Sequence, residues 1–188
     1  MSFRKLSVLA AATLLLAAFA LSPARAQSTV PADLSFQQAS GGSVALSAFA
    51  GRKAVVVVFL NPACAYTRLY QERLSALSSA FGGRGVQFLF VNVPINLDAN
   101  EGGSGALATY ADAGPASAAL GVSRTTEAVV LQPAGGSFAV RYRGAIDDNP
   151  QVASGVQQAY LQQVLESLLA GRPAAVADKR AAGCLIKR

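Results

Sequence analysis

The sequence contains no histidine and only two cysteines, Cys64 and Cys184. Zinc and copper sites are built from several thiolate and imidazole ligands, so two cysteines alone are too few for such a site. Without histidine, a nucleophile in this chain would also need another means of activation. We therefore expect neither a metal nor an organic cofactor.

The chain also lacks clustered positive charge, although its formal net charge is +6. Arg4, Lys5 and Arg25 contribute three of these charges and lie close to the N-terminus. We find no stripe of Lys and Arg with interleaved aromatic side chains, which would indicate a nucleic-acid-binding surface. No amphipathic basic segment indicates a membrane surface. Nucleic acid is therefore not an expected partner.

Residues 1–26 have the charged, apolar and small-residue order of a secretory signal peptide. The apolar stretch covers residues 6–21, and Ala24 and Ala26 offer small residues for cleavage. A membrane anchor is the alternative, but this stretch is shorter than the ~20 residues that a span requires. We therefore expect residues 27–188 to form one exported domain without stable membrane association. Its expected location is the periplasm or the medium, where two thiols can form a disulfide.

The most informative stretch is 55–81, where a predicted strand is followed by a predicted helix. Six consecutive apolar residues at 55–60 indicate a strand buried on both faces. Apolar residues then recur at helical spacing over residues 65–81. Cys64 lies at the junction, near the positive end of the helix dipole and unpaired backbone N–H groups, which favour a thiolate. Cys64 is therefore the candidate nucleophile, and the alternative is a buried small hydrophobic residue at a strand end.

Similar patterns in the rest of the chain predict an α/β domain with a mixed central sheet flanked by helices. A second buried strand over residues 86–93 would complete a parallel, right-handed βαβ unit with the first. In such a sheet the functional site lies at the carboxyl ends of the parallel strands, where Cys64 falls. The other expected features are a flexible start at 27–33, a hairpin of 34–36 and 44–46, a turn capped by Ser47, a left-handed glycine cap within 82–85, a loop at 96–105, a short helix at 106–113, a turn at 116–120, an antiparallel hairpin of 127–131 and 137–143, a helix at 156–170 and an irregular tail at 174–188.

Several of these segments resemble the thioredoxin-like superfamily over residues 34–188. They are the Leu46-Ser47-x-Phe49-x-Gly51-x-Lys53 segment after the first hairpin, the strand leading to Cys64, and the final ββα order. The stretch 142–148 and the run Gly183-Cys184-Leu185-Ile186 are similar to a bacterial subgroup of exported redoxins related to the alkyl hydroperoxide reductase/thiol-specific antioxidant (peroxiredoxin-like) group. The resemblance implies a thioredoxin-like fold with an N-terminal β-hairpin, and thiol chemistry at Cys64.

Three positions depart from the patterns of these families. Thr67 stands where thioredoxins have the second cysteine of Cys-x-x-Cys, and Asn61 stands where peroxiredoxins have Thr or Ser. Thr125-Thr126 replaces the Thr-Pro of the loop that lies against the active thiol in the family. Because a cis bond before a residue other than proline costs roughly 3 kcal/mol, we expect this loop to be trans or strained.

Several side chains are candidates to assist Cys64, each with a structural alternative. Cys184 can resolve an adduct of Cys64, form a permanent bridge with it, or be a free thiol. Arg68, one helical turn beyond Cys64, and Arg124 can stabilise a thiolate or a peroxide anion, or be solvated surface charges. Thr67 can donate a hydrogen bond to the sulfur, or serve only the first helical turn.

Asp147 and Asp148 are predicted to mark a turn rather than to act as an acid and a base. From Cys64 and its position, the leading hypothesis is a periplasmic redoxin in which Cys64 attacks a protein disulfide or a peroxide, and Cys184 or an external thiol then resolves the adduct. The alternative is a non-catalytic thioredoxin-fold binding module whose cysteines are structural.

Overall fold

The computed structural model describes residues 28–96, 107–112 and 115–188. The predicted leader, residues 1–26, and the predicted loop at 96–105, except for Asn96, lie outside the described residues. Among the described residues, no helix has the length and apolar character needed to cross a membrane.

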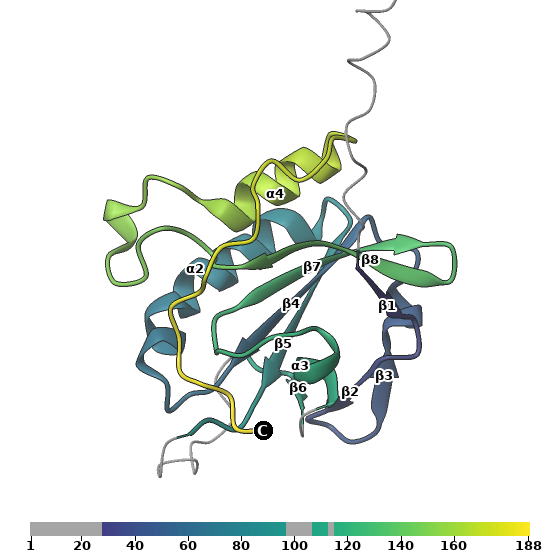
Figure 1. The fold of residues 1–188 in the computed structure, drawn as a ribbon, viewed down its shortest axis with the longest axis horizontal. Coiled ribbons are helices and arrows are strands. Elements are labelled where there is room, and N and C mark those ends of the chain that lie inside the picture. Colours follow the sequence, from purple (N-terminus) through teal and green to yellow (C-terminus); the bar gives the residue numbers. More distant parts are fainter. Residues whose placement is uncertain (1–27, 97–106, 113–114) are drawn as a thin grey trace, which may run out of the picture.

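The strands form one mixed sheet in the order β1-β8-β7-β4-β5-β6-β2-β3 (Figure 1). At its centre, β4 and β5 pair in parallel and β7 pairs antiparallel with β4. The described strands are β1 (Thr29–Pro31), β2 (Ser35–Gln38), β3 (Ser43–Ala45), β4 (Ala54–Leu60), β5 (Val86–Asn92), β6 (Tyr110–Ala111), β7 (Ala128–Ala134) and β8 (Ser137–Gly144). The described helices are the 3₁₀ turns η1 (Leu46–Phe49) and η2 (Ala153–Gly155), and α2 (Ala65–Gly82), α3 (Pro115–Ala119) and α4 (Tyr160–Leu169).

Each face of the sheet is covered by its own hydrophobic core, which confirms the predicted architecture. On one face, α2 and α4 bury Leu74 and Leu161 against alternate β4 residues such as Val56. On the other face, Val57 packs with side chains from α3, η1 and β2. Alternating residues of β4 point to opposite faces, so every residue of this strand is buried.

The carboxyl end of β4 leads directly into α2, as predicted. The helix ends without the expected left-handed cap, because Gly83 has a φ of −67°. Within residues 82–85, only Gly85 has a left-handed φ, of 90°. The antiparallel pairing of β7 and β8 and the helical turn α3 agree with the predicted hairpin and turn.

Three further local predictions are wrong. Residues Tyr110–Ala111 form β6 rather than part of a helix, since their backbone pairs with both β5 and β2. Residues Thr29–Pro31 form β1 along β8 rather than a flexible start, and Val30 is buried there. Ser47 does not cap η1, whose N-cap is Ala45 and has no side-chain hydrogen bond.

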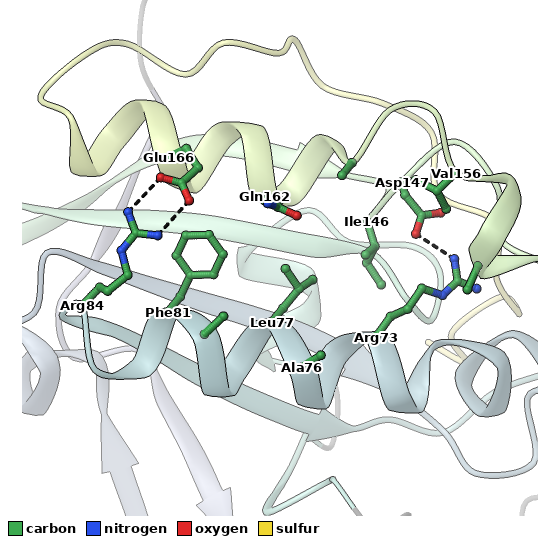
Figure 2. A pocket seen from close by; sticks show the side chains of 13 residues that line it. Arg73, Ala76, Leu77, Phe81, Arg84, Ile146, Asp147, Val156, Gln162 and Glu166 are labelled. Carbon is green, nitrogen blue, oxygen red and sulfur yellow. Dashed lines mark hydrogen bonds and ion pairs between the residues drawn. The ribbon is translucent and has the colours of Figure 1, made fainter.

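The final helix is shorter than predicted, because α4 begins at Tyr160 after the separate turn η2. Between α4 and α2 lies a cavity of about 390 Å³, with Leu77 and Phe81 in its wall (Figure 2). An exposed ion pair between Arg84 and Glu166 closes one end, with an N···O distance of 2.7 Å. This pair lowers the pKa of Glu166 and raises that of Arg84, chiefly through the hydrogen bonds that join them.

Candidate functional site

Cys64 is the N-cap residue of α2 and has an extended backbone, with φ −78° and ψ 124°. The loop that precedes it is fixed by Asn61, whose Nδ2 donates to the Val93 carbonyl at 2.7 Å and whose Oδ1 accepts the Ala63 N–H at 2.9 Å. The Cys64 N–H itself donates to the Asn61 carbonyl at 2.9 Å. The Asn61 side chain therefore ties the loop between β4 and α2 to the residue after β5.

Cys64 forms a disulfide with Cys184, and their Cα atoms are 6.0 Å apart. The two residues are separated by 120 positions in the sequence. Cys64 is completely buried, whereas Cys184 is partly exposed. Of the three alternatives for Cys184, the structure shows a bridge to Cys64.

Cys184 belongs to the tail, which runs from α4 back to the carboxyl ends of β4 and β5 (Figure 1). On one side of the tail, the Thr125 N–H donates to the Cys184 carbonyl at 2.9 Å, and the Ile186 N–H donates to the Ser123 carbonyl at 3.0 Å. On the other side, the Asn96 N–H donates to the Leu185 carbonyl at 3.0 Å. The tail segment 182–187 is therefore seated between two loop edges by main-chain hydrogen bonds.

Thr125 contacts both cysteines and is completely buried. Its hydroxyl donates to Cys64 Sγ at 3.1 Å, and its Oγ1 accepts the Cys184 N–H at 2.9 Å. Sequence reasoning did not single out Thr125 as a site residue. The signal that could have found it is its place in the loop that faces the thiol in the resembling family.

The next residue, Thr126, has a φ of 61°. Positive φ is rare for a β-branched residue and is a strained conformation. The surrounding contacts hold it there: its N–H donates to the Phe59 carbonyl at 2.7 Å, and its hydroxyl donates to the Ala182 carbonyl. No cis peptide bond occurs among the residues that the structure describes. The loop is therefore trans and strained, as the sequence predicted.

The predicted helpers contact the segments that carry the sulfurs. Arg68 Nη1 donates to the Pro62 and Ala63 carbonyls at 2.9 and 3.2 Å, in the loop before Cys64. Arg124 Nη1 donates to the Gly183 carbonyl at 2.9 Å.

The Thr67 hydroxyl oxygen accepts the N–H of Asn61 at 3.2 Å. Its contact in the structure is thus to the loop backbone. The structure brings Cys64, Cys184 and Thr125 into one cluster, with both arginines at its border.

Asp147 lies in the predicted turn and also joins it to α2. Its carboxylate accepts the Asn149 N–H at 3.1 Å, the Tyr70 hydroxyl at 2.8 Å and Arg73 Nη1 at 2.7 Å (Figure 2 shows the Arg73 pair). Burial, followed by the hydrogen bond to Asp147, raises the pKa of Tyr70. Asp148 accepts the Gln157 N–H at 3.0 Å. Both carboxylates therefore organise the chain after β8.

In the part of the chain that the structure describes, no cluster of three or more His, Cys, Asp or Glu side chains could hold a metal ion. The order of strands and helices around Cys64 defines the fold. β4, α2 and β5 form a parallel βαβ unit, the β7–β8 hairpin lies on the other side of β4, and α4 returns to the α2 face. Cys64 occupies the N-cap position of α2, and the loop before β7 lies against its sulfur. The fold is thioredoxin-like.

Several solved structures of bacterial proteins are similar to this structure. A hypothetical protein from Sinorhizobium meliloti is 21% identical over 87% of this chain and 95% of its own, with a TM-score of 0.70. An uncharacterized conserved protein from Geobacillus kaustophilus is 20% identical over 86% and 92%, with a TM-score of 0.69. Peroxiredoxin Q from Xanthomonas campestris is 20% identical over 76% and 96%, with a TM-score of 0.48.

No protein-family model matches this thioredoxin-like chain, and neither does any curated protein. At these low sequence identities, the TM-scores of 0.70 and 0.69 show a shared fold alone, and a shared fold does not fix a reaction. The function must therefore be argued from the site.

Proposed function

We propose that this protein is a periplasmic thiol redoxin that cycles between the Cys64–Cys184 disulfide and the dithiol. The observation that carries the proposal is the position of Cys64: it caps α2, receives the Thr125 hydroxyl, and is bonded to a cysteine on a tail seated by main-chain hydrogen bonds. A purely structural bridge needs none of these features around its sulfur.

Two features support a thiolate at Cys64 in the reduced protein. The α2 helix is 18 residues long, and the positive end of its dipole lies at Cys64. The Thr125 hydroxyl donates to the same sulfur, and a hydrogen bond to a charged group favours the charged form. Together they activate the nucleophile in a chain without histidine.

The proposed substrates are a protein disulfide or a peroxide. With a disulfide, the Cys64 thiolate forms a mixed disulfide with one substrate sulfur and expels the other as a thiolate. With a peroxide, Cys64 attacks one oxygen, becomes a sulfenic acid and releases an alcohol or water. In both cases the Cys184 thiolate then attacks Cys64 Sγ, which forms the bridge and expels the substrate thiolate or water. An external thiol restores the dithiol.

Substrate access requires movement of the tail, because Cys64 is completely buried beneath it. Reduction removes the covalent link and leaves the main-chain hydrogen bonds, each contributing about 0.5–1.5 kcal/mol, and the buried side chain of Ile186. A segment held this weakly opens by local unfolding more readily than the sheet does.

The chemical test uses the full-length mature protein and its Cys64→Ser and Cys184→Ser variants. We expect mild reductant to open the bridge while the protein stays folded, and Cys64 to be alkylated faster than free cysteine at neutral pH. Cys64→Ser should abolish disulfide exchange or peroxidase activity, whereas Cys184→Ser should accumulate the first adduct. A bridge that resists reduction in the folded protein, or activity that survives Cys64→Ser, would refute the proposal and favour a binding module with structural cysteines.

The proposed location has a separate test. Mass spectrometry of the protein from a periplasmic extract should find a chain that begins at Gln27, the residue after the predicted cleavage site. A chain recovered only from the cytoplasm and with its first 26 residues intact would refute export.

A further inference from the structure

The two cysteines of the bridge differ in exposure, electrostatic surroundings and attachment to the fold. We infer that the external thiol that re-reduces this protein attacks Cys184 rather than Cys64, and that this thiol belongs to a negatively charged molecule. The inference rests on the proposed redox cycle and names the exchange residue and the class of reductant.

Access to the bridge favours attack at Cys184. Thiol–disulfide exchange requires the attacking thiolate to reach one of the two sulfurs. Cys64 is completely buried beneath the tail and Thr125, whereas Cys184 is partly exposed. In the oxidised protein, an external thiolate therefore meets the sulfur on the tail first.

The leaving group favours the same direction. Exchange is faster when the departing sulfur is the better stabilised thiolate. Attack at Cys184 makes Cys64 the leaving group, and Cys64 departs at the N-terminus of α2 with the Thr125 hydroxyl directed at it. Attack at Cys64 would instead expel Cys184, which belongs to the irregular tail and is not itself at the start of a helix.

The step balances as a two-electron exchange. The external thiolate forms a bond to Cys184 Sγ, the Cys64–Cys184 bond breaks, and its electron pair stays on Cys64 as a thiolate. A second external thiolate then attacks the external sulfur of the mixed disulfide and releases the Cys184 thiolate. The protein gains two electrons, and two reductant molecules leave joined by a disulfide.

The charges around the bridge select the reductant. The Arg124 guanidinium is bonded to the carbonyl of the residue before Cys184, and the Arg68 guanidinium is bonded to the loop before Cys64. Lys187, three residues beyond Cys184, is exposed. Against these stands Glu127, whose carboxylate accepts two N–H groups of the same loop as Arg124. The surplus of positive charge attracts an anionic thiol and repels a cationic one.

The first experiment locates the adduct. Oxidised full-length protein is mixed with mercaptopropionate, and early samples are quenched with acid, unfolded, treated with maleimide and mapped by mass spectrometry. We expect the mercaptopropionate adduct on Cys184 and maleimide on Cys64. The reverse labelling at the earliest times would overturn the inference while leaving the redox cycle intact, whereas a bridge that no thiol opens would refute the cycle itself.

The second experiment measures the charge preference. Reduction rates per thiolate are compared for anionic mercaptopropionate, neutral mercaptoethanol and cationic cysteamine. At low salt we expect mercaptopropionate to exceed cysteamine by about tenfold, and the ratio to collapse at about 0.5 M salt. Equal rates at low salt, or a faster cationic thiol, would overturn the choice of reductant.

A matched pair of charge reversals tests the origin of the preference. Lys187→Glu should reduce the ratio of the anionic to the cationic rate by at least half. Arg52→Glu makes the same charge change in the exposed turn before β4, at the opposite end of that strand from Cys64, and should leave the ratio unchanged. A ratio that falls equally in both variants would show that net charge, rather than charge beside Cys184, sets the rate.

Discussion

At Gly183 the tail lies directly against the loop that contacts Cys64. A Cβ atom there would overlap the carbonyl oxygen of Thr125 and lie 2.8 Å from the carbonyl carbon. Its φ is outside the left-handed region, so the restriction is one of space and not of backbone conformation. Because the opposing atoms are main chain and cannot swing away, Gly183→Ala should prevent the tail from docking.

The cost of losing this docking follows from the contacts on either side. Three hydrogen bonds of 2.9 Å would be lost: Thr125 N–H to the Cys184 carbonyl, Cys184 N–H to Thr125 Oγ1, and Arg124 Nη1 to the Gly183 carbonyl. At about 1 kcal/mol each, their loss weakens the oxidised state by about 3 kcal/mol. In the reduced protein the tail opens by local unfolding, so these bonds stabilise the oxidised state more than the reduced one. The equilibrium constant for forming the bridge should therefore fall by up to about 100-fold, which raises the reduction potential by up to about 60 mV.

The assay is equilibration in glutathione redox buffers, followed by alkylation and measurement of the oxidised fraction by mass. Gly51→Ala is the matched control, because a Cβ at Gly51 meets nothing within 4 Å and its φ is also outside the left-handed region. The oxidised fraction of Gly51→Ala should follow the same redox titration curve as that of the wild type. If Gly183→Ala titrates within about threefold of the wild type, a difference of less than 1 kcal/mol, tail docking does not set the stability of the bridge.

Three further predictions follow from the buried polar groups. Thr125→Val, made with Cys184→Ser so that Cys64 is free, removes the hydrogen bond to the sulfur and should slow alkylation of Cys64 at neutral pH by about tenfold. Asp147→Ala leaves the Arg73 charge unpaired in a largely buried position, so urea unfolding should show a loss of about 3–5 kcal/mol. Burial raises the pKa of Tyr142 above its ordinary value of 10.0, so its contribution to stability is complete below pH 10.0 and is lost as the pH rises towards the folded-state value. Tyr142→Phe removes this ionisable hydroxyl. Once its stability at pH 7 is allowed for, the variant should therefore unfold at a higher alkaline pH than the wild type.

Each of these predictions has a comparison that can contradict it. Thr67→Val removes a hydroxyl that accepts from the loop backbone, and an equal slowing of alkylation in this variant would show that Thr125 acts only through the fold. Arg84→Ala breaks the exposed pair with Glu166 and should cost clearly less than Asp147→Ala. An alkaline unfolding midpoint that does not move in Tyr142→Phe would remove tyrosine ionisation as the cause.

The strand–helix segment around Cys64 could be predicted because its local signals and its environment agree. β4 and α2 fall within one residue of the ranges read from the sequence. A continuous apolar run fits a strand that is buried on both faces, and helical spacing fits a helix with one buried face. Neither element depends on a distant partner for its identity, so the pattern alone was sufficient.

The misread elements are those whose identity depends on pairing. β6 consists of two residues, Tyr110–Ala111, which become a strand only because β5 and β2 lie on either side. β1 is three residues long and is defined by its pairing with β8, where Val30 lies opposite Phe138. Segments this short carry no period of their own, and tertiary hydrogen bonds override their weak local preference.

The candidate site likewise contains one residue that local sequence signals could predict and others that they could not. Cys64 is marked by a local strand–helix junction, whereas the position of Cys184 depends on main-chain bonds from the tail to two loops that are distant in sequence. Thr125 acts through a hydroxyl that contacts both cysteines, and it precedes the strained residue Thr126. A side-chain direction fixed by tertiary contacts leaves no periodic trace in the sequence.

The tail has a second attachment that does not depend on the bridge. The Ala145 N–H donates to the Lys179 carbonyl at 3.0 Å, and the Lys179 N–H donates to the Arg143 carbonyl at 3.3 Å, beside β8. We expect reduction to leave both bonds intact. The five residues that follow Lys179, ending at Cys184, then limit how far the sulfur can move, to about 17 Å even when fully extended. A tether of this length keeps the Cys184 thiol at an effective concentration in the millimolar range near Cys64. The two cysteines are 120 positions apart in the sequence, and under the proposed redox cycle this anchor would nevertheless keep the two thiols together within one molecule.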